Sequence, residues 1–205
     1  ALWSLLWGTI GLMGCPDPIT VDGEETEPDF LYRVENGAMV DAEDAHLYFR
    51  GMNVANAAKG TEDHLVDITD EDIAIFKENG IRQARLLTFW KAITPDEPGV
   101  VDEAYLDKFL ERVKKLTDND IYVVIDMHQD LWGAPFVNHG APTWACPEEL
   151  QAGYEAQSPW WSNYTSEQVS GCFDHFWESP TLQDNFASAW VAMAEKVCGE
   201  DKVLG

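Results

Sequence analysis

The sequence has few basic residues. Lys and Arg together number 13 against 37 Asp and Glu, so the formal net charge of the 205 residues is −24. A field of this sign repels the phosphates of nucleic acids and of anionic lipids. We therefore expect no nucleic-acid partner and a ligand that is neutral or cationic.

Several sequence signatures of catalysis are also missing. No G-x-G-x-x-G follows the first expected strand, which disfavours a dinucleotide-binding fold, and no G-x-S-x-G predicts a serine nucleophile. The spacings of the cysteines match no zinc motif. Asp126, His128 and Asp130 alternate and could share one face of a strand as metal ligands, but no second group of ligands is visible. We expect neither a metal nor an organic cofactor.

A run long enough to cross a membrane is absent from the N-terminus. Residues 1–14 are uncharged and apolar, but they fall short of the roughly 20 residues that span a bilayer and instead resemble the core of a secretory signal. The sequence Leu-Met-Gly before Cys15 resembles a bacterial lipoprotein cleavage box. We predict a lipoprotein-type signal over 1–15, lipidation at Cys15 and an acidic Pro/Gly tether over 16–29. The protein is then exported to the bacterial cell envelope, or secreted if the signal is an ordinary one.

An exported protein can form disulfides between its remaining cysteines. Cys146 and Cys172 lie in one long irregular stretch, so we predict that they pair with each other. Cys198 ends a helical pattern and is expected to be a buried free thiol.

Beyond residue 30 the sequence alternates between strand and helix patterns. Asn36-Gly37 between two extended runs predicts a hairpin over 30–40. Alternation of this kind predicts parallel strands with right-handed crossovers, either in a doubly wound sheet or in a barrel. The expected elements are strands at 46–54, 82–89 and 121–127, helices starting after Thr69 and covering 102–119 and 181–198, an irregular stretch at 131–180, and the start of a further strand at 202–204.

Polar residues cluster where the three expected strands end. In a barrel these ends converge on the active site, and buried charges there are costly unless they are paired. Each residue also has a structural interpretation: Arg85 as a structural ion pair, His128 as a core histidine, Lys59 as a solvated loop residue and Trp90 as packing. The residues in question are Asn53 and then Lys59 after the first strand, Arg85 and Trp90 with the second, and Asp126, His128 and Asp130 with the third.

Several segments taken together resemble family 5 glycoside hydrolases of clan A, and within them the endoglycoceramidase branch. They are R-G-M-N at 50–53, A-N-A-A-K at 55–59, R-L-L-T-F-W at 85–90, D-M-H-Q-D at 126–130, N-H-G-A-P-x-W-A at 138–145 and F-D-x-F-W at 173–177. The resemblance covers residues 30–205. It implies the N-terminal part of a (β/α)8 TIM barrel, preceded by a β-hairpin and ending at about strand four.

The resemblance also implies a reaction. Retaining enzymes of this type use two glutamates about 5–5.5 Å apart, and both are expected beyond Gly205, so we expect residues 1–205 alone to be inactive. The implied substrate is a glycosphingolipid, cut at the β-bond between glucose and ceramide. A family 5 glucanase, a steryl-glucosidase-like enzyme with another β-glycoside substrate, and a non-catalytic sugar-binding lipoprotein are the alternatives.

Roles of individual residues follow from the same resemblance. Arg85 would support the nucleophile, and Lys59 and Asp130 would hold hydroxyl groups of the first sugar. His128 would line the subsite where the bond is cut, Asn53 would support the floor of the site, and Trp90 matches a substrate-binding position.

Overall fold

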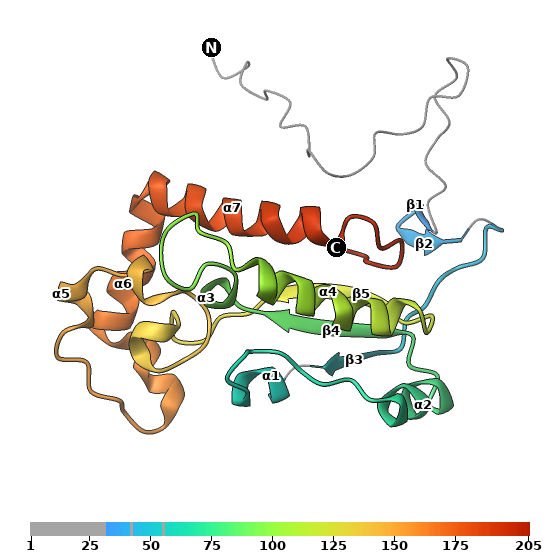
Figure 1. Ribbon diagram of the computed structural model, residues 1–205, viewed down its shortest axis with the longest axis horizontal. Coiled ribbons are helices and arrows are strands. Elements are labelled where there is room, and N and C mark those ends of the chain that lie inside the picture. Colours follow the sequence, from blue (N-terminus) through green and yellow to red (C-terminus); the bar gives the residue numbers. More distant parts are fainter. Residues whose placement is uncertain (1–31, 42, 55) are drawn as a thin grey trace, which may run out of the picture.

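The computed structural model describes residues 32–41, 43–54 and 56–205. The predicted signal peptide, tether and lipidation site at Cys15 lie outside the described residues. Figure 1 shows α4 in front of β4 and β5, α7 above them and α1 and α2 below, with the segment 131–178 gathered at one end of the strands. None of the helices in the described ranges combines the length and apolarity needed to cross a membrane.

The central sheet consists of three parallel strands in the order β3 (Gly51–Val54), β4 (Gln83–Thr88) and β5 (Tyr122–Met127). At the free edge of β5, Val203 forms a parallel bridge to Val123, which is where a further strand was expected. β4 lies between its two neighbours and is buried along most of its length, as its apolar sequence predicts. The predicted parallel α/β order is confirmed.

The predicted hairpin is also confirmed. β1 (Arg33–Glu35) and β2 (Ala38–Val40) pair antiparallel around a turn in which Asn36 has φ 49° and Gly37 has φ 80°. Both central residues of such a tight turn need positive φ, which explains the Asn-Gly sequence.

The single strand predicted over 46–54 is wrong in length. Its first part belongs to the hairpin, because His46 bridges Val40 and the Leu47 N–H donates to the Met39 carbonyl at 2.8 Å. Only Gly51–Val54 joins the parallel sheet. One apolar run is thus divided between two sheets, which periodicity within the run cannot reveal.

The predicted helices are present, and the one predicted after Thr69 begins at that capping residue. Thr69 caps α2 (Asp70–Glu78) through a capping box with Asp72, and Asp102 caps α4 (Glu103–Thr117) by accepting from the backbone N–H of Tyr105. α7 (Pro180–Val197) follows the pattern predicted over 181–198, and it packs on α4, which in turn covers β5. Two short helices, α1 (Asn56–Gly60) and α3 (Trp90–Ile93), were not predicted.

The stretch predicted as irregular contains a helix, so that prediction is wrong for α6 (Glu167–Glu178). Ser166 caps it, and apolar residues recur along it at helical spacing, a signal that could have revealed it. The rest of the stretch is short turns: η1 (Ala134–Phe136), η2 (Thr143–Ala145), α5 (Glu148–Gln151) and η3 (Trp160–Thr165).

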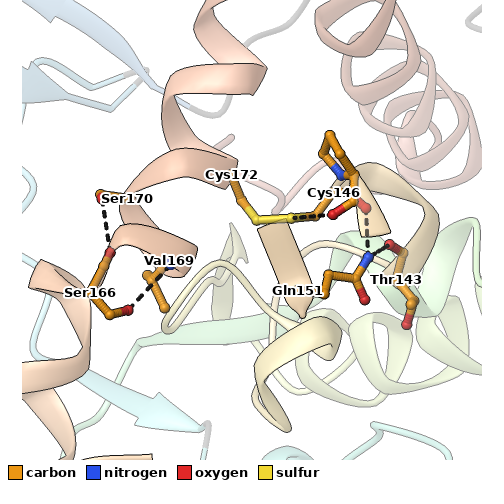
Figure 2. The surroundings of a disulfide bond; sticks show 8 residues. Thr143, Cys146, Gln151, Ser166, Val169, Ser170 and Cys172 are labelled. Carbon is orange, nitrogen blue, oxygen red and sulfur yellow. Dashed lines mark hydrogen bonds between the residues drawn. A yellow bond between two sulfur atoms is a disulfide. The ribbon is translucent and has the colours of Figure 1, made fainter. Parts of the chain in front are cut away.

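A disulfide joins the two halves of this stretch. Cys146 after η2 and Cys172 in α6 are bonded, with their Cα atoms 5.3 Å apart (Figure 2). The Gln151 side chain closes the turn before it by donating to the carbonyls of Thr143 and Cys146 at 3.2 and 2.6 Å. Cys198 is a free thiol and is half-buried rather than buried.

Candidate active site

Charged side chains from neighbouring strand ends form one hydrogen-bonded group. Arg85 Nη2 on β4 donates to Asp126 Oδ2 on β5 at 2.6 Å, and the same oxygen lies 3.0 Å from His128 Nδ1. The other ring nitrogen of His128 lies 3.1 Å from Asp130 Oδ2, which accepts from Lys59 Nζ at 2.5 Å. Along this group, Asp126 lies between Arg85 and His128, and Asp130 lies between His128 and Lys59.

Asn53 on β3 completes the group. Its Oδ1 lies 3.5 Å from Arg85 Nη1, at the limit of a hydrogen bond. We call Asn53, Lys59, Arg85, Asp126, His128 and Asp130 the polar network. Five of the six side chains expected at the site from the sequence are therefore brought together here, with Asp126 between them.

The polar network is partly open to solvent. Exposed fractions of the side chains are 18% for His128 and Asp130, 27% for Lys59 and 40% for Arg85. Such values leave the polar atoms accessible to a ligand while their positions are fixed by neighbours. Burial by itself would raise the pKa of Asp130, but the hydrogen bonds and charges of Lys59 and His128 outweigh it and hold that pKa below its usual value.

His128 is the centre of the polar network because carboxylate oxygens face both of its ring nitrogens. Its backbone N–H donates to the Thr88 carbonyl at 2.8 Å, which extends the pairing of β4 and β5 by one bond. Its ring meets Phe89 in an edge contact with centroids 6.2 Å apart. Three contacts thus orient the imidazole, and the backbone bond fixes the residue that carries it.

Comparison with known proteins identifies the family. The family model described as cellulase (glycosyl hydrolase family 5) matches residues 40–205. This chain belongs to glycosyl hydrolase family 5. Endoglycoceramidase I of Rhodococcus hoagii is 31% identical over 139 residues, which cover 67% of this chain and 28% of that protein.

Two further relatives cover more of the chain. The endoglycoceramidase of Cyanea nozakii is 26% identical over 198 residues, covering 83% of this chain and 39% of that protein. The solved structure of endo-glycoceramidase II from Rhodococcus sp. with ganglioside GM3 matches with a TM-score of 0.71 at 30% identity, covering 80% of this chain and 40% of that chain. The β-α units of this family 5 chain therefore correspond to part of a TIM barrel, and the chain spans less than half the length of these relatives.

Trp90 is not part of the polar network in this family 5 chain. It is only 3% exposed, and its ring packs edge-on against Trp144 and Phe186 at centroid distances of 5.3 and 5.1 Å. This packing among aromatic rings agrees with the structural interpretation of Trp90. Trp90 also lines a cavity with His128, so its predicted contact with substrate stays a prediction.

A second group of side chains lies beside the polar network. Trp90, Trp132, Phe173, Phe176 and Phe186 contact one another through a series of edge and tilted ring pairs, and we call them the aromatic cluster. They line a cavity of about 240 Å³ together with His128 and Gln129. The polar network and the aromatic cluster therefore share His128 as a border.

Two histidines next to the polar network were not predicted. The rings of His64 and His139 lie 5.9 Å apart and both pack on Phe89, at 5.5 and 5.3 Å. Burial, aided by the charge of Lys91, lowers the pKa of His64 and lowers the pKa of His139 to about 4. Both rings are therefore neutral at neutral pH. Only the N-H-G-A-P pattern around His139 gave a sequence signal for either one.

The polar network can bind a polyhydroxylated ligand. It offers carboxylate acceptors and cationic donors within a few ångströms of one another, which suits hydroxyl groups that both donate and accept. Among the residues that the structure describes, no three His, Cys, Asp or Glu side chains are arranged to hold a metal ion. The chemistry that this arrangement supports is recognition of a sugar through its hydroxyl groups.

Proposed function

We propose that the full-length protein containing this chain is a retaining β-glycosidase that releases the glycan from glycosphingolipids. The observation that carries the proposal is the polar network, in which Lys59, Arg85, His128 and Asp130 meet at the ends of parallel strands. Its support from relatives is the similarity to endoglycoceramidases, one of them solved with ganglioside GM3.

Each residue has a role in this proposal that follows from its chemistry. Lys59 donates to, and Asp130 accepts from, hydroxyl groups of the sugar next to the bond that is cut. His128 lines that subsite with its ring held between two carboxylates. Arg85 keeps a carboxylate nucleophile ionised and oriented, since a nearby guanidinium favours the charged form. Asn53 supports Arg85 from below.

The two catalytic carboxylic acids are not assigned to residues of this chain. Asp126 and Asp130 are already paired with Arg85 and Lys59. The pKa of Asp130 is lowered, whereas a general acid needs a raised pKa. We propose that both are glutamates beyond Gly205 in the full-length sequence. One protonates the departing oxygen while the other forms a glycosyl-enzyme that water then hydrolyses.

The test is turnover by the purified full-length protein. A glycosphingolipid with a fluorescent acyl chain should yield labelled ceramide and an intact oligosaccharide, separated by chromatography. Cello-oligosaccharides and a steryl glucoside are offered in parallel, because a preference for either one identifies the alternative family 5 enzymes. Sugar binding without turnover of any of these substrates would leave the binding-lipoprotein alternative and reject the proposed hydrolase.

We also propose export and a lipid anchor at Cys15, which would place the enzyme at a membrane where glycolipids reside. The support is the sequence before Cys15 and a disulfide at Cys146–Cys172, since such bonds persist in oxidising compartments. Expression in a bacterium fed an alkyne fatty acid should label the wild-type protein and not the Cys15→Ser variant. Equal labelling of both proteins would contradict the anchor.

A further inference from the structure

A three-residue segment, Asn138–Gly140, passes beside Asp130 and is held by consecutive main-chain carbonyl groups. The carbonyl oxygen of Asn138 accepts from Lys91 Nζ at 2.9 Å, and that of Gly140 accepts from the backbone N–H of Lys91 at 2.8 Å. The carbonyl between them, that of His139, accepts from the backbone N–H of Asp130 at 2.6 Å. Lys91 thus holds both ends of this segment, which we call the strap, and Asp130 is bound to its middle.

The backbone that follows Asp130 is strained and lies against the strap. Leu131 and Trp132 have φ of 46° and 70°, which is unfavourable for residues with a Cβ and persists only where surrounding contacts impose it. Gly140 has φ 145°, and a Cβ there would lie 2.5 Å from the Trp132 carbonyl oxygen. The turn that carries Asp130 therefore depends on the strap for its shape.

The position of the Asp130 carboxylate follows from this backbone. Sheet pairing ends with the bond from the His128 N–H to the Thr88 carbonyl, so the bond to the strap is the next main-chain contact that fixes Asp130. One carboxylate oxygen, Oδ2, meets both Lys59 Nζ and His128 Nε2. A displacement of the strap would change both distances at once.

The surroundings of Lys91 suit a structural cation. Its ammonium is half-buried, and burial lowers the pKa of Lys91. His64 and His139 face it and are neutral at neutral pH, because burial and the charge of Lys91 lower the pKa of both. Lys59 and Asp130 also act on His139, and they neutralise each other as an ion pair. Lys91 therefore faces two neutral rings rather than two further cations.

We propose that Lys91 is a positioning residue that holds Asp130 through the strap and so sets the geometry of Asp130 with Lys59 and His128. The effect of Lys91 on catalysis rests on the proposed function. The contact between Lys91 and the strap is independent of the proposed function and can be measured without any substrate.

Hydrogen exchange in the full-length protein tests the contact. Mass spectrometry of peptides spanning 128–141 should show at least about 10-fold faster exchange in Lys91→Met than in the wild type, because the Asp130 N–H loses a fixed acceptor. Lys91→Arg keeps a donor and should stay within about 2-fold. Lys108→Met, at a position that lines the same surface cavity as Lys91, is the matched control and should not differ.

Two outcomes of this experiment overturn the proposal. Unchanged exchange in Lys91→Met means that Lys91 does not hold the strap. Faster exchange that extends to α4 means that Lys91 supports the whole fold rather than Asp130.

A double-mutant cycle measured by activity tests whether Lys91 affects catalysis through Asp130. Lys91→Met should lower kcat/KM about 10-fold in the wild type and less than about 2-fold in the Asp130→Asn background, with Lys91→Arg near the wild-type value. An equal loss in both backgrounds would show that Lys91 acts independently of Asp130. If the wild type cleaves no glycoside, the proposed function fails, whereas the exchange experiment still decides the role of Lys91.

Discussion

The polar network and the aromatic cluster meet at His128 but are held together by different forces. In the polar network, Arg85 and Lys59 remain 40% and 27% exposed and are placed by directional bonds to carboxylates. In the aromatic cluster, Trp90 and Trp132 are 3% and 4% exposed and are placed by ring packing. His128 touches both groups. The comparison teaches that directional bonds place one group and ring packing the other, and in the proposed function the polar network is the group that contacts the sugar.

The largest expected effect tests the packing of the aromatic cluster. Trp132→Ala should lower the free energy of unfolding by about 3–5 kcal/mol, because it removes a buried indole and leaves a cavity among aromatic rings. Urea denaturation of the full-length protein measures this loss. The control is Trp161→Ala, whose side chain is 60% exposed and whose loss should cost less than about 1 kcal/mol. Equal losses would mean that the aromatic cluster is no more tightly packed than the surface.

The disulfide next to the aromatic cluster should have a slightly smaller effect. Replacing Cys146 and Cys172 by Ser opens a loop with a sequence separation of 26 residues and should destabilise the fold by about 3 kcal/mol. Cys198→Ser, at the free thiol, is the matched control and should change stability by less than about 1 kcal/mol. A double Ser variant as stable as the wild type would show that the disulfide does not stabilise this region.

The next effect tests the polar network. Asp130→Asn keeps the shape of the side chain but removes the charge that Lys59 and His128 face, so kcat/KM should fall about 100-fold. Stability should change by less than about 1 kcal/mol, because the network is partly solvated. Asp174→Asn on the exposed side of α6 is the control. Loss of stability without loss of activity would reverse the roles that we assign to the two regions.

The smallest effect concerns the histidines beside the polar network. Burial lowers the pKa of His139 from 6.5 to about 4, so between these values the unfolded chain binds a proton that the folded protein does not. Stability should therefore fall as the pH drops from 6.5 to 4, by about 1–2 kcal/mol after allowance for partial exposure of the ring. The lowered pKa of Asp130 acts below pH 3.8, outside this window.

The measurement is urea unfolding of wild type and His139→Gln across that pH window. The variant should lose the part of the pH dependence that belongs to His139, whatever its absolute stability. The same slope in both proteins would show that the ring is not buried in the way the structure describes.

The sequence predicted local elements well where a residue strongly favours one backbone conformation, such as a turn or a helix cap. Asn36-Gly37 predicted its hairpin and Thr69 predicted the start of α2, because turn and cap preferences depend on a few adjacent residues. It missed the division of the run 46–54 between two sheets and the helix α6 inside a stretch that seemed irregular. The division of the run depends on partners outside it, Val40 for His46 and Gln83 for Gly51. The helix α6, in contrast, carried a local signal in Ser166 and in its helical spacing.

For the site, the sequence by itself determined which residues stand at the ends of three successive parallel strands, since strand order and side-chain alternation follow from local pattern. Only the tertiary structure decided that Lys59 reaches Asp130, 71 residues away, that Trp90 is buried among aromatic rings, and that Lys91 holds the strap. The physical reason is that these contacts join residues far apart in the sequence, which meet only in the folded chain. A local preference acts over a few neighbouring residues and carries no information about such contacts.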